Sequence, residues 1–368
     1  MQPTKKLGFG LMRLPQKDGK IDIEAVKALV DEFIDSGFTY FDTAYCYPGS
    51  EEAFKAAVSS RYDRKQYTVA TKLAGWLLSE TFSPEQMFKE QLERCGVEYF
   101  DYYLLHSLQP SRIKDYDDYD CWQFCNRMKA EGKIINYGFS FHGDPVLLEE
   151  LLTKHPEVDF VQLQLNYIDW DDTAAIFASQ NYEVARRHGK KIIVMEPVRG
   201  GYLANLPERS ATKLAALGAD RSQASYAMRF VGALDGVMMV LSGMNTHEQL
   251  ADNIKTFDNF VPLDEAEQKA IEEVKRSLFD VETVPCTSCR YCTKGCPMNI
   301  DIPEIFKPYN MLKIYGEHAR PHLYYGAVIN GGSGKASDCI ACGQCESACP
   351  QHIEIIKQLK NAAEMLDK

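Results

Sequence analysis

The sequence lacks a hydrophobic run that could cross a membrane, because no stretch approaches the roughly eighteen uncharged apolar residues that a spanning helix needs. It also lacks a surplus of positive charge: 41 Lys and Arg face 52 Asp and Glu, for a formal net charge of −11. Since phosphate binding needs a basic face, this balance argues against a nucleic-acid partner. The first ten residues show no apolar run of a secretory signal, so we expect a cytoplasmic protein without a membrane interaction.

Short apolar runs alternate with amphipathic helical patterns along the first 280 residues. The strand candidates are residues 6–12, 38–42, 67–72, 100–106, 134–140, 159–166, 191–195 and 236–241. Helical patterns occupy residues 23–35, 51–60, 84–95, 119–130, 145–153, 173–188 and 246–256, with one more at 264–278. Eight strands alternating with helices predict an α/β fold of the (β/α)8 barrel type. A doubly wound open sheet is the alternative, but no G-x-G-x-x-G pattern opens the first helix.

Cysteine is abundant in the last quarter of the chain. Eight of the twelve cysteines form two copies of the pattern C-x2-C-x2-C-x3-C-P. They are Cys286, Cys289, Cys292 and Cys296 in the first copy, and Cys339, Cys342, Cys345 and Cys349 in the second. This is the run with which bacterial two-cluster ferredoxins bind 4Fe-4S clusters. Zinc sites usually use cysteine pairs separated by a longer loop, and disulfides need an oxidising compartment, so we predict two 4Fe-4S clusters.

The fourth cysteine of each run ligates the other cluster in two-cluster ferredoxins. One cluster would then use Cys286, Cys289, Cys292 and Cys349, and the other Cys339, Cys342, Cys345 and Cys296. The residues between the two runs carry apolar side chains at helical spacing, and residues 350–366 predict a helix that docks the tail. We therefore expect a barrel domain over residues 1–280 and a small, mainly α-helical ferredoxin-like domain over residues 281–368.

Four reactive side chains stand where the predicted strands end. Asp42 ends the second strand, Lys72 the third and His106 the fourth, while Tyr47 follows Asp42 in the next loop. In (β/α)8 barrels the chemistry collects on the loops at the C-terminal ends of the strands. The sequence therefore predicts that these four side chains converge on one active site. Cys46 and His142 lie near them, and we assign Cys46 a packing role and His142 a contact with cofactor or substrate.

The segments F-D-T-A-Y-C-Y at 41–47, V-A-T-K at 69–72 and D-Y-Y-L-L-H at 101–106 resemble the aldo/keto reductase family, and the resemblance covers residues 5–258. It implies a barrel, a nicotinamide cofactor across its mouth and hydride transfer to a carbonyl. Tyr47 would then donate a proton to the carbonyl oxygen, and Lys72, held by Asp42, would lower the pKa of Tyr47. His106 would orient the substrate oxygen or share the proton relay.

The resemblance also implies a set of cofactor contacts. The candidates are Met12, Ser140, Gln162, Met195, Arg199, Gly200, Ser242, Gly243, Asn245, Gln249 and Asn253. The loops after the seventh and eighth strands would hold the phosphates, because glycines permit close approach and a helix N-terminus favours an anion. Three positions depart from the family. Met195 replaces an aromatic residue, Phe141 replaces the asparagine of a Ser-Asn pair, and Gln249 replaces the arginine that pairs with the 2′-phosphate of NADP. The nucleotide therefore stays open between NADP and NAD, and FMN is also possible.

The two halves together predict an iron-sulfur oxidoreductase that reduces a carbonyl or related unsaturated small molecule. Electrons would come from NAD(P)H, through the clusters, or both, with a ferredoxin or flavodoxin-like protein as the partner. A cluster passes one electron at a time whereas a nicotinamide cofactor gives a hydride, so the route between them stays open. The alternatives are a plain NAD(P)H-dependent reductase with structural or oxygen-sensing clusters, and a non-catalytic electron-carrying or regulatory subunit.

Overall fold

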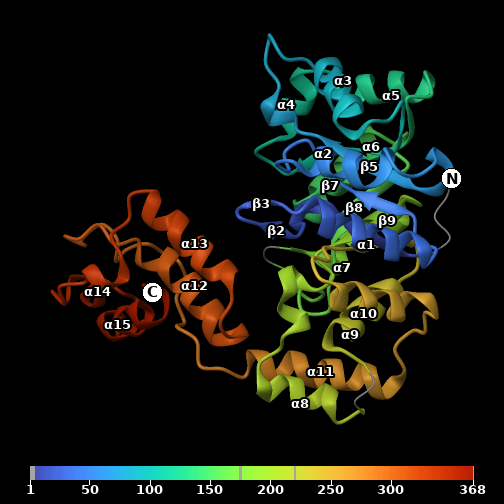
Figure 1. The fold of residues 1–368 in the computed structure, drawn as a ribbon. Coiled ribbons are helices and arrows are strands. Elements are labelled where there is room, and N and C mark those ends of the chain that lie inside the picture. Colours follow the sequence, from blue (N-terminus) through green and yellow to red (C-terminus); the bar gives the residue numbers. More distant parts are fainter. Residues whose placement is uncertain (1–4, 174–175, 219–220, 368) are drawn as a thin grey trace. The chain divides into compact units, whose positions relative to one another are not determined.

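The structure is a computed structural model that describes residues 5–173, 176–218 and 221–367. The chain divides into two compact units (Figure 1). The first comprises Met1–Arg199 and Asp220–Glu265, and the second comprises Gly200–Ala219 and Ala266–Lys368. The predicted domain ranges and the predicted helix 173–188 include a few residues outside the described ones. The domain boundary at residue 280 stays a prediction, since the second unit also contains segments that precede it.

Eight parallel strands of the first unit close into a barrel, in the order β1-β10-β9-β8-β7-β6-β5-β4 (Figure 1). They are β1 (Leu7–Gly10), β4 (Tyr40–Asp42), β5 (Thr68–Leu73), β6 (Phe100–Leu108), β7 (Ile134–Phe141), β8 (Phe160–Gln164), β9 (Lys191–Met195) and β10 (Val237–Ser242). Each of the eight predicted strands overlaps one of these, so the predicted barrel is confirmed. A separate antiparallel hairpin joins β2 (Gln16–Lys17) to β3 (Lys20–Ile21) through Asp18 and Gly19, both at positive φ, as a tight hairpin turn requires.

Helices accompany the strands in the first unit. They are α1 (Ile23–Asp35), α2 (Ser50–Phe54), α3 (Pro84–Cys95), α4 (Ile113–Asp118), α5 (Cys121–Ala130), α6 (Pro145–Lys154), α7 (Ala178–Arg187), α9 (Gln223–Gly232) and α10 (His247–Asp258). The predicted helix 51–60 is divided, because a π-helical segment, Lys55–Ser59, follows α2. The sequence patterns did not identify α9, most of whose side chains are buried, so it offers little of the polar face that marks an amphipathic helix.

The two-residue period of the strands sets the direction of the reactive side chains. Tyr40 packs inside the barrel with Tyr102 and Phe160, whereas Phe41 packs outside against Phe9 and Phe33. Asp42, two residues after Tyr40, therefore shares the interior side at the C-terminal end of β4. The same alternation places Lys72 beyond interior Ala70, and His106 beyond interior Leu104. The barrel thus directs all three side chains toward its C-terminal end.

The second unit is helical among its described residues. Its helices are α8 (Glu208–Ala215), α11 (Glu265–Phe279), α12 (Ile302–Tyr315), α13 (Ala319–Asn330), α14 (Gln344–Ser347) and α15 (Ile355–Leu366). Apolar side chains from α12 and α15, among them Phe306, Leu312 and Leu359, form its core together with Cys292 and Cys345. This confirms the predicted helical, cysteine-rich tail. In the described parts of both units, no helix is long and apolar enough to cross a membrane.

Candidate active site

A buried ion pair stands at the C-terminal ends of β4 and β5. The Lys72 ammonium lies 2.5 Å from Asp42 Oδ1 and donates a second hydrogen bond to the Thr43 carbonyl oxygen at 2.6 Å. Both side chains are almost fully buried. Burial raises the pKa of Asp42 and would lower that of Lys72, but the nearby Asp42 carboxylate reverses this and raises the pKa of Lys72. The pair therefore keeps a fixed ammonium charge at the end of the barrel.

Tyr47 and His106 meet beside this ammonium. The Lys72 Nζ lies 5.1 Å from the centroid of the Tyr47 ring. The Tyr47 and His106 rings stand edge to face, with centroids 5.7 Å apart. The structure thus brings together all four side chains that the sequence selected. A carbonyl oxygen beside Tyr47 and His106 would have two potential proton or hydrogen-bond donors.

Burial is the largest influence on the pKa of both Tyr47 and His106. It raises the pKa of the Tyr47 phenol above its ordinary value, and the Lys72 ammonium opposes this only in part. Lys72 thus acts on the Tyr47 pKa in the predicted direction, but burial, which the prediction left out, outweighs it. Burial, aided by the positive charge of Lys72, lowers the pKa of His106 well below its ordinary value. At neutral pH, Tyr47 holds its proton and His106 is a neutral imidazole.

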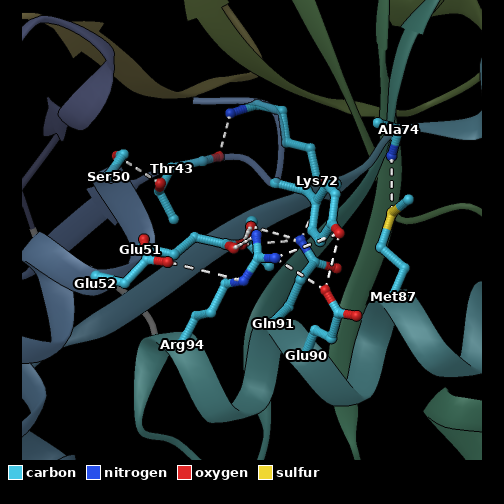
Figure 2. A network of polar contacts seen from close by, with 12 residues as sticks. Thr43, Ser50, Glu51, Glu52, Lys72, Ala74, Met87, Glu90, Gln91 and Arg94 are labelled. Atoms are coloured by element: carbon cyan, nitrogen blue, oxygen red, sulfur yellow. Dashed lines mark hydrogen bonds and ion pairs between the residues drawn. The ribbon is translucent and has the colours of Figure 1, made fainter. Parts of the chain in front are cut away.

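A buried polar network supports Lys72 from the helix side of the sheet (Figure 2). Thr71, which alternates outward next to Lys72, donates to Glu51 Oε1 at 2.7 Å. Gln91 Nε2 lies within hydrogen-bond distance of Glu51, Thr71 and the Lys72 carbonyl oxygen, at 3.0, 2.9 and 3.1 Å. Tyr103 completes the set by donating to Gln91 Oε1 at 2.6 Å. Because α2, α3, β5 and β6 each supply a member, the network fixes the backbone that carries Lys72.

A second buried contact joins the loops after β5 and β6. The Tyr116 hydroxyl donates to the His106 carbonyl oxygen and accepts a hydrogen bond from the Gly75 amide at 3.2 Å. A Cβ atom on Gly75 would come within 2.7 Å of the Tyr116 ring, so only glycine permits this approach. The backbone after His106 then turns through Ser107, at φ 57°, whose amide donates to Ser140 Oγ at 2.6 Å.

Sequence reasoning missed Trp76 and Arg112, and it assigned Cys46 only to packing. The Trp76 ring lies 5.4 Å from the His106 ring, and the Arg112 guanidinium carbon lies 3.9 Å from the Trp76 ring centroid. Cys46 Sγ lies 3.4 Å from His106 Nδ1. Trp76 follows Lys72 by four residues, in the segment directly after β5, and this position was the one signal available in the sequence.

The predicted cofactor contacts fall into two groups. Ser140 and Gln162 lie at the barrel interior, and Met195 is half-buried at the end of β9. Gln162 Oε1 is buried and has no hydrogen-bond partner among the described residues, so it could accept a bond from a carboxamide. Met12, in contrast, is 62 % exposed. The interior residues therefore fit the amide end of a nicotinamide.

The loop after β10 is organised by its own side chains. Asn253 donates to Ser242 Oγ at 2.9 Å, and Gln249 accepts a bond from the Asn245 amide at 2.9 Å. Thr246 caps the N-terminus of α10. This end suits an anion, although the Gln249 side chain brings no charge to it. Beside it, a Cβ on Gly243 would meet Arg13 Cβ at 3.8 Å and the Gly10 carbonyl oxygen at 3.9 Å, so the space there is open.

Arg199 differs from the prediction that it supplies charge to the phosphates. Its Nε lies 3.0 Å from Asp169 Oδ1 and 3.1 Å from Oδ2, so its charge faces a buried carboxylate. The following Gly200 has φ 68°, a left-handed conformation that favours glycine.

The eight cysteines of the second unit line two small cavities. Cys286, Cys289, Cys292 and Cys349 line the first, and Cys296, Cys339, Cys342 and Cys345 line the second. Apolar side chains such as Phe306 in the first and Leu359 in the second form much of the remaining walls. Across the described residues, no three His, Cys, Asp or Glu side chains converge as they would around a single metal ion. Four thiols around one cavity suit a cluster, and the grouping is the one that crossed ligation predicts.

Comparisons with known proteins agree with the barrel and with the cysteine-rich C-terminal region. The model of the aldo/keto reductase family matches residues 6–276, and that of a 4Fe-4S dicluster domain matches residues 285–354. An aldo-keto reductase of Mycobacterium sp. (strain KMS) is 27% identical over 136 residues, which are 37% of this chain and 45% of that protein. The chain spans less than half the length of the first curated relatives that it matches.

Solved structures share the barrel. An aldo-keto reductase of Bacillus halodurans, in its holo form, is 24% identical with a TM-score of 0.59, covering 74% of this chain and 96% of that one. One from Klebsiella pneumoniae in complex with NADPH is 18% identical with a TM-score of 0.58, covering 73% and 90%. At these identities the similarity concerns the fold, and the match of the family model over most of the chain carries the assignment. The chain belongs to the aldo/keto reductase family and carries a 4Fe-4S domain at its C-terminal end.

Proposed function

We propose that the protein is an iron-sulfur oxidoreductase that reduces a carbonyl or related unsaturated group at the C-terminal end of the barrel. One observation carries the proposal: Tyr47 and His106 stand beside an ammonium that a buried carboxylate holds in place. A reduction places negative charge on the substrate oxygen, and this arrangement offers a proton donor and a fixed positive charge to meet it.

Each residue has a separate role in this reaction. A nicotinamide cofactor, when bound, would supply the hydride to the carbonyl carbon. Tyr47 donates its proton to the carbonyl oxygen, and its raised pKa ensures that the proton is present at neutral pH. The Lys72 ammonium stabilises the tyrosinate that remains, and Asp42 keeps that ammonium in place. Neutral His106 orients the substrate oxygen by a hydrogen bond.

Gln162 and Ser140 would contact the nicotinamide amide, and the residues around Ser242 and Asn245 would contact the phosphates. The NADPH complex of the Klebsiella pneumoniae reductase, with its similar fold, supports NADP as the nucleotide. Gln249 provides no charge for the 2′-phosphate, which favours NAD relative to an arginine-bearing site. We therefore propose NADP or NAD, with FMN as a further possibility for the same phosphate loop.

The two cysteine-lined cavities support two 4Fe-4S clusters in the second unit. Bound clusters would supply one-electron transfer, and a ferredoxin or flavodoxin-like protein is the proposed partner. We also propose a cytoplasmic location, because such clusters are sensitive to oxygen and a reducing compartment keeps their cysteines as thiols.

The test uses the full chain purified without oxygen. Iron and sulfide are measured first, and oxidation of NADPH and NADH is then followed with a panel of small aldehydes and ketones. Tyr47→Phe should lower kcat at least about a hundredfold, as expected for loss of a general acid. Tyr45→Phe is the matched control. It removes a tyrosine hydroxyl from the same loop, but that hydroxyl donates to Glu90 at 2.8 Å and has no proposed role in the reaction. Equal activity of Tyr47→Phe and wild type would contradict the proposal.

Cluster absorbance recorded during turnover tests the electron route. Bleaching when a carbonyl substrate is reduced, or when reduced ferredoxin is added, supports participation of the clusters. Loaded clusters whose spectrum never changes during full turnover would instead indicate a plain NAD(P)H-dependent reductase with structural clusters.

A further inference from the structure

Arg112 is separated from His106 by the ring of Trp76. Its guanidinium carbon is 3.9 Å from the centroid of the Trp76 ring, and the same ring is 5.4 Å from the His106 ring. Both Trp76 and Arg112 are half-buried. Trp76 comes from the loop after β5 and Arg112 from the loop after β6, so both belong to the end of the barrel that carries Tyr47.

The charge of Arg112 has no counter-charge among the residues that the structure describes. No carboxylate lies within ion-pair distance of its guanidinium, whereas Arg94 and Arg64 pair with Glu90 and Asp101 at 2.9 and 2.6 Å. A half-buried guanidinium that only stacks on an indole keeps its hydrogen-bond donors available. Arginine presents these donors in a planar fork that matches a carboxylate.

The surroundings of His106 are positive, although the whole chain has a net charge of −11. Besides burial, the cations Lys72 and Arg112 act on its imidazole, and both favour its neutral form. Lys72 is already paired with Asp42, whereas Arg112 has no carboxylate partner among the described residues. Such a local positive region attracts anions from solution.

Arg112 lies on the opposite side of the barrel from the residues proposed to bind the cofactor phosphates. Around the closed barrel, β6 lies four strands from β10 in either direction, so the two strands are opposite each other. The phosphate candidates Ser242 and Asn245 follow β10, and Arg112 follows β6. An anion on Arg112 would therefore belong to the substrate.

We propose that the substrate is a short carbonyl acid, whose carbonyl oxygen lies at Tyr47 and His106 and whose carboxylate binds Arg112. This inference rests on the proposed carbonyl reduction. The Trp76 ring lies between Arg112 and His106. The carbon chain that joins the substrate's carbonyl to its carboxylate would pass along this ring, and the width of the ring corresponds to a few carbon atoms. Arg112 is thus a specificity-determining residue, which the catalytic tetrad alone would not reveal.

The first experiment compares two substrates that differ by one charge, 4-oxobutanoate and its methyl ester, in the anaerobic holoenzyme. A charged hydrogen bond to the carboxylate should favour the acid roughly tenfold to a hundredfold in kcat/KM. Arg112→Gln should abolish this preference, mainly through a higher KM for the acid. Arg112→Lys should retain part of it. Arg127→Gln, on α5 in an exposed pair with Glu85, is the matched control.

A second measurement does not depend on turnover. Succinate, which has no carbonyl to reduce, should alter the fluorescence of Trp76, and the change should disappear in Arg112→Gln and in Trp76→Phe. Equal reduction of acid and ester by wild type, together with no succinate response, would overturn the inference and leave carbonyl reduction intact. An Arg112-dependent succinate response without reduction of any carbonyl would contradict the proposed function but support the anion site.

Discussion

Cys46 Sγ lies 3.4 Å from Nδ1 of His106. Burial raises the pKa of the Cys46 thiol and lowers that of the His106 imidazole, so at neutral pH the thiol is protonated and the imidazole is neutral. The thiol is therefore the donor and Nδ1 the acceptor. The ring proton of His106 must then reside on Nε2, where it can orient a substrate oxygen.

Cys46→Ala should consequently release His106 into a mixture of tautomers. Loss of one weak hydrogen bond should lower kcat about twofold to tenfold with little change in KM. The direct measurement is the 15N NMR signature of His106, assigned with His106→Gln. Cys125→Ala, which removes a buried thiol on α5, is the control. A His106 signature identical in wild type and Cys46→Ala would contradict the donor role of Cys46.

Lys72→Met should destabilise the first unit because it leaves the buried Asp42 carboxylate without its cation. The expected loss in the free energy of unfolding is about 3–5 kcal/mol. Urea unfolding can be followed by tryptophan fluorescence, since Trp76, Trp122 and Trp170 all lie in this unit. Adding Asp42→Asn to the same chain should recover part of the loss. If the double variant is no more stable than Lys72→Met alone, the uncompensated carboxylate is not the cause.

The pH dependence of turnover should reflect the raised pKa of Tyr47. Reduction needs the protonated phenol, so its kcat should stay flat across neutral pH and fall only above the ordinary value of 10.0. Oxidation of an alcohol needs the tyrosinate and should rise with pH over the same range. Lys72 opposes the upward shift of the pKa, so a Lys72→Met protein with residual activity should lose reduction at still higher pH. A fall in reduction between pH 6 and 8 would exclude Tyr47 as the titrating donor.

Gln91→Leu should disturb the network behind Lys72 without touching the reacting groups. It removes the partner of Glu51, Thr71 and Tyr103 and leaves buried polar atoms unsatisfied, which should cost about 2–3 kcal/mol of unfolding free energy. Gln180→Leu, on the exposed side of α7, should change stability by less than about 0.5 kcal/mol. Thermal unfolding of both variants would check this, and equal midpoints would show that the network contributes nothing.

Crossed ligation makes a prediction about pairs of cysteines. Cys286 and Cys349 line the same cavity, so replacing both with alanine should remove one cluster and halve the iron and sulfide content. Cys339 and Cys349 line different cavities, so the same replacement there should damage both clusters. Uncrossed ligation would give the reverse order of iron content, and Ser347→Ala, close to Cys349, serves as the control.

The sequence was sufficient for the fold because strand and helix periods survive in local patterns. All eight barrel strands were predicted, and α1 and α3 begin and end at the predicted residues. The sequence pattern did not predict α9, because most side chains of this helix are buried and it shows little contrast between an apolar and a polar face. The four side chains at the active site were also predictable, because residues at the ends of neighbouring parallel strands must meet at one edge.

By itself, the sequence determined the barrel, the cysteine runs and the identity of Asp42, Tyr47, Lys72 and His106. Only the tertiary structure decided the upward shift of the Tyr47 pKa, since desolvation depends on packing that no local pattern records. It also decided that Arg199 faces Asp169, that Cys46 meets His106, and that Arg112 stacks on Trp76 without a carboxylate partner among the described residues. Each of these contacts joins segments that follow or end different strands, and their distance in space is set by closure of the barrel and not by spacing along the chain.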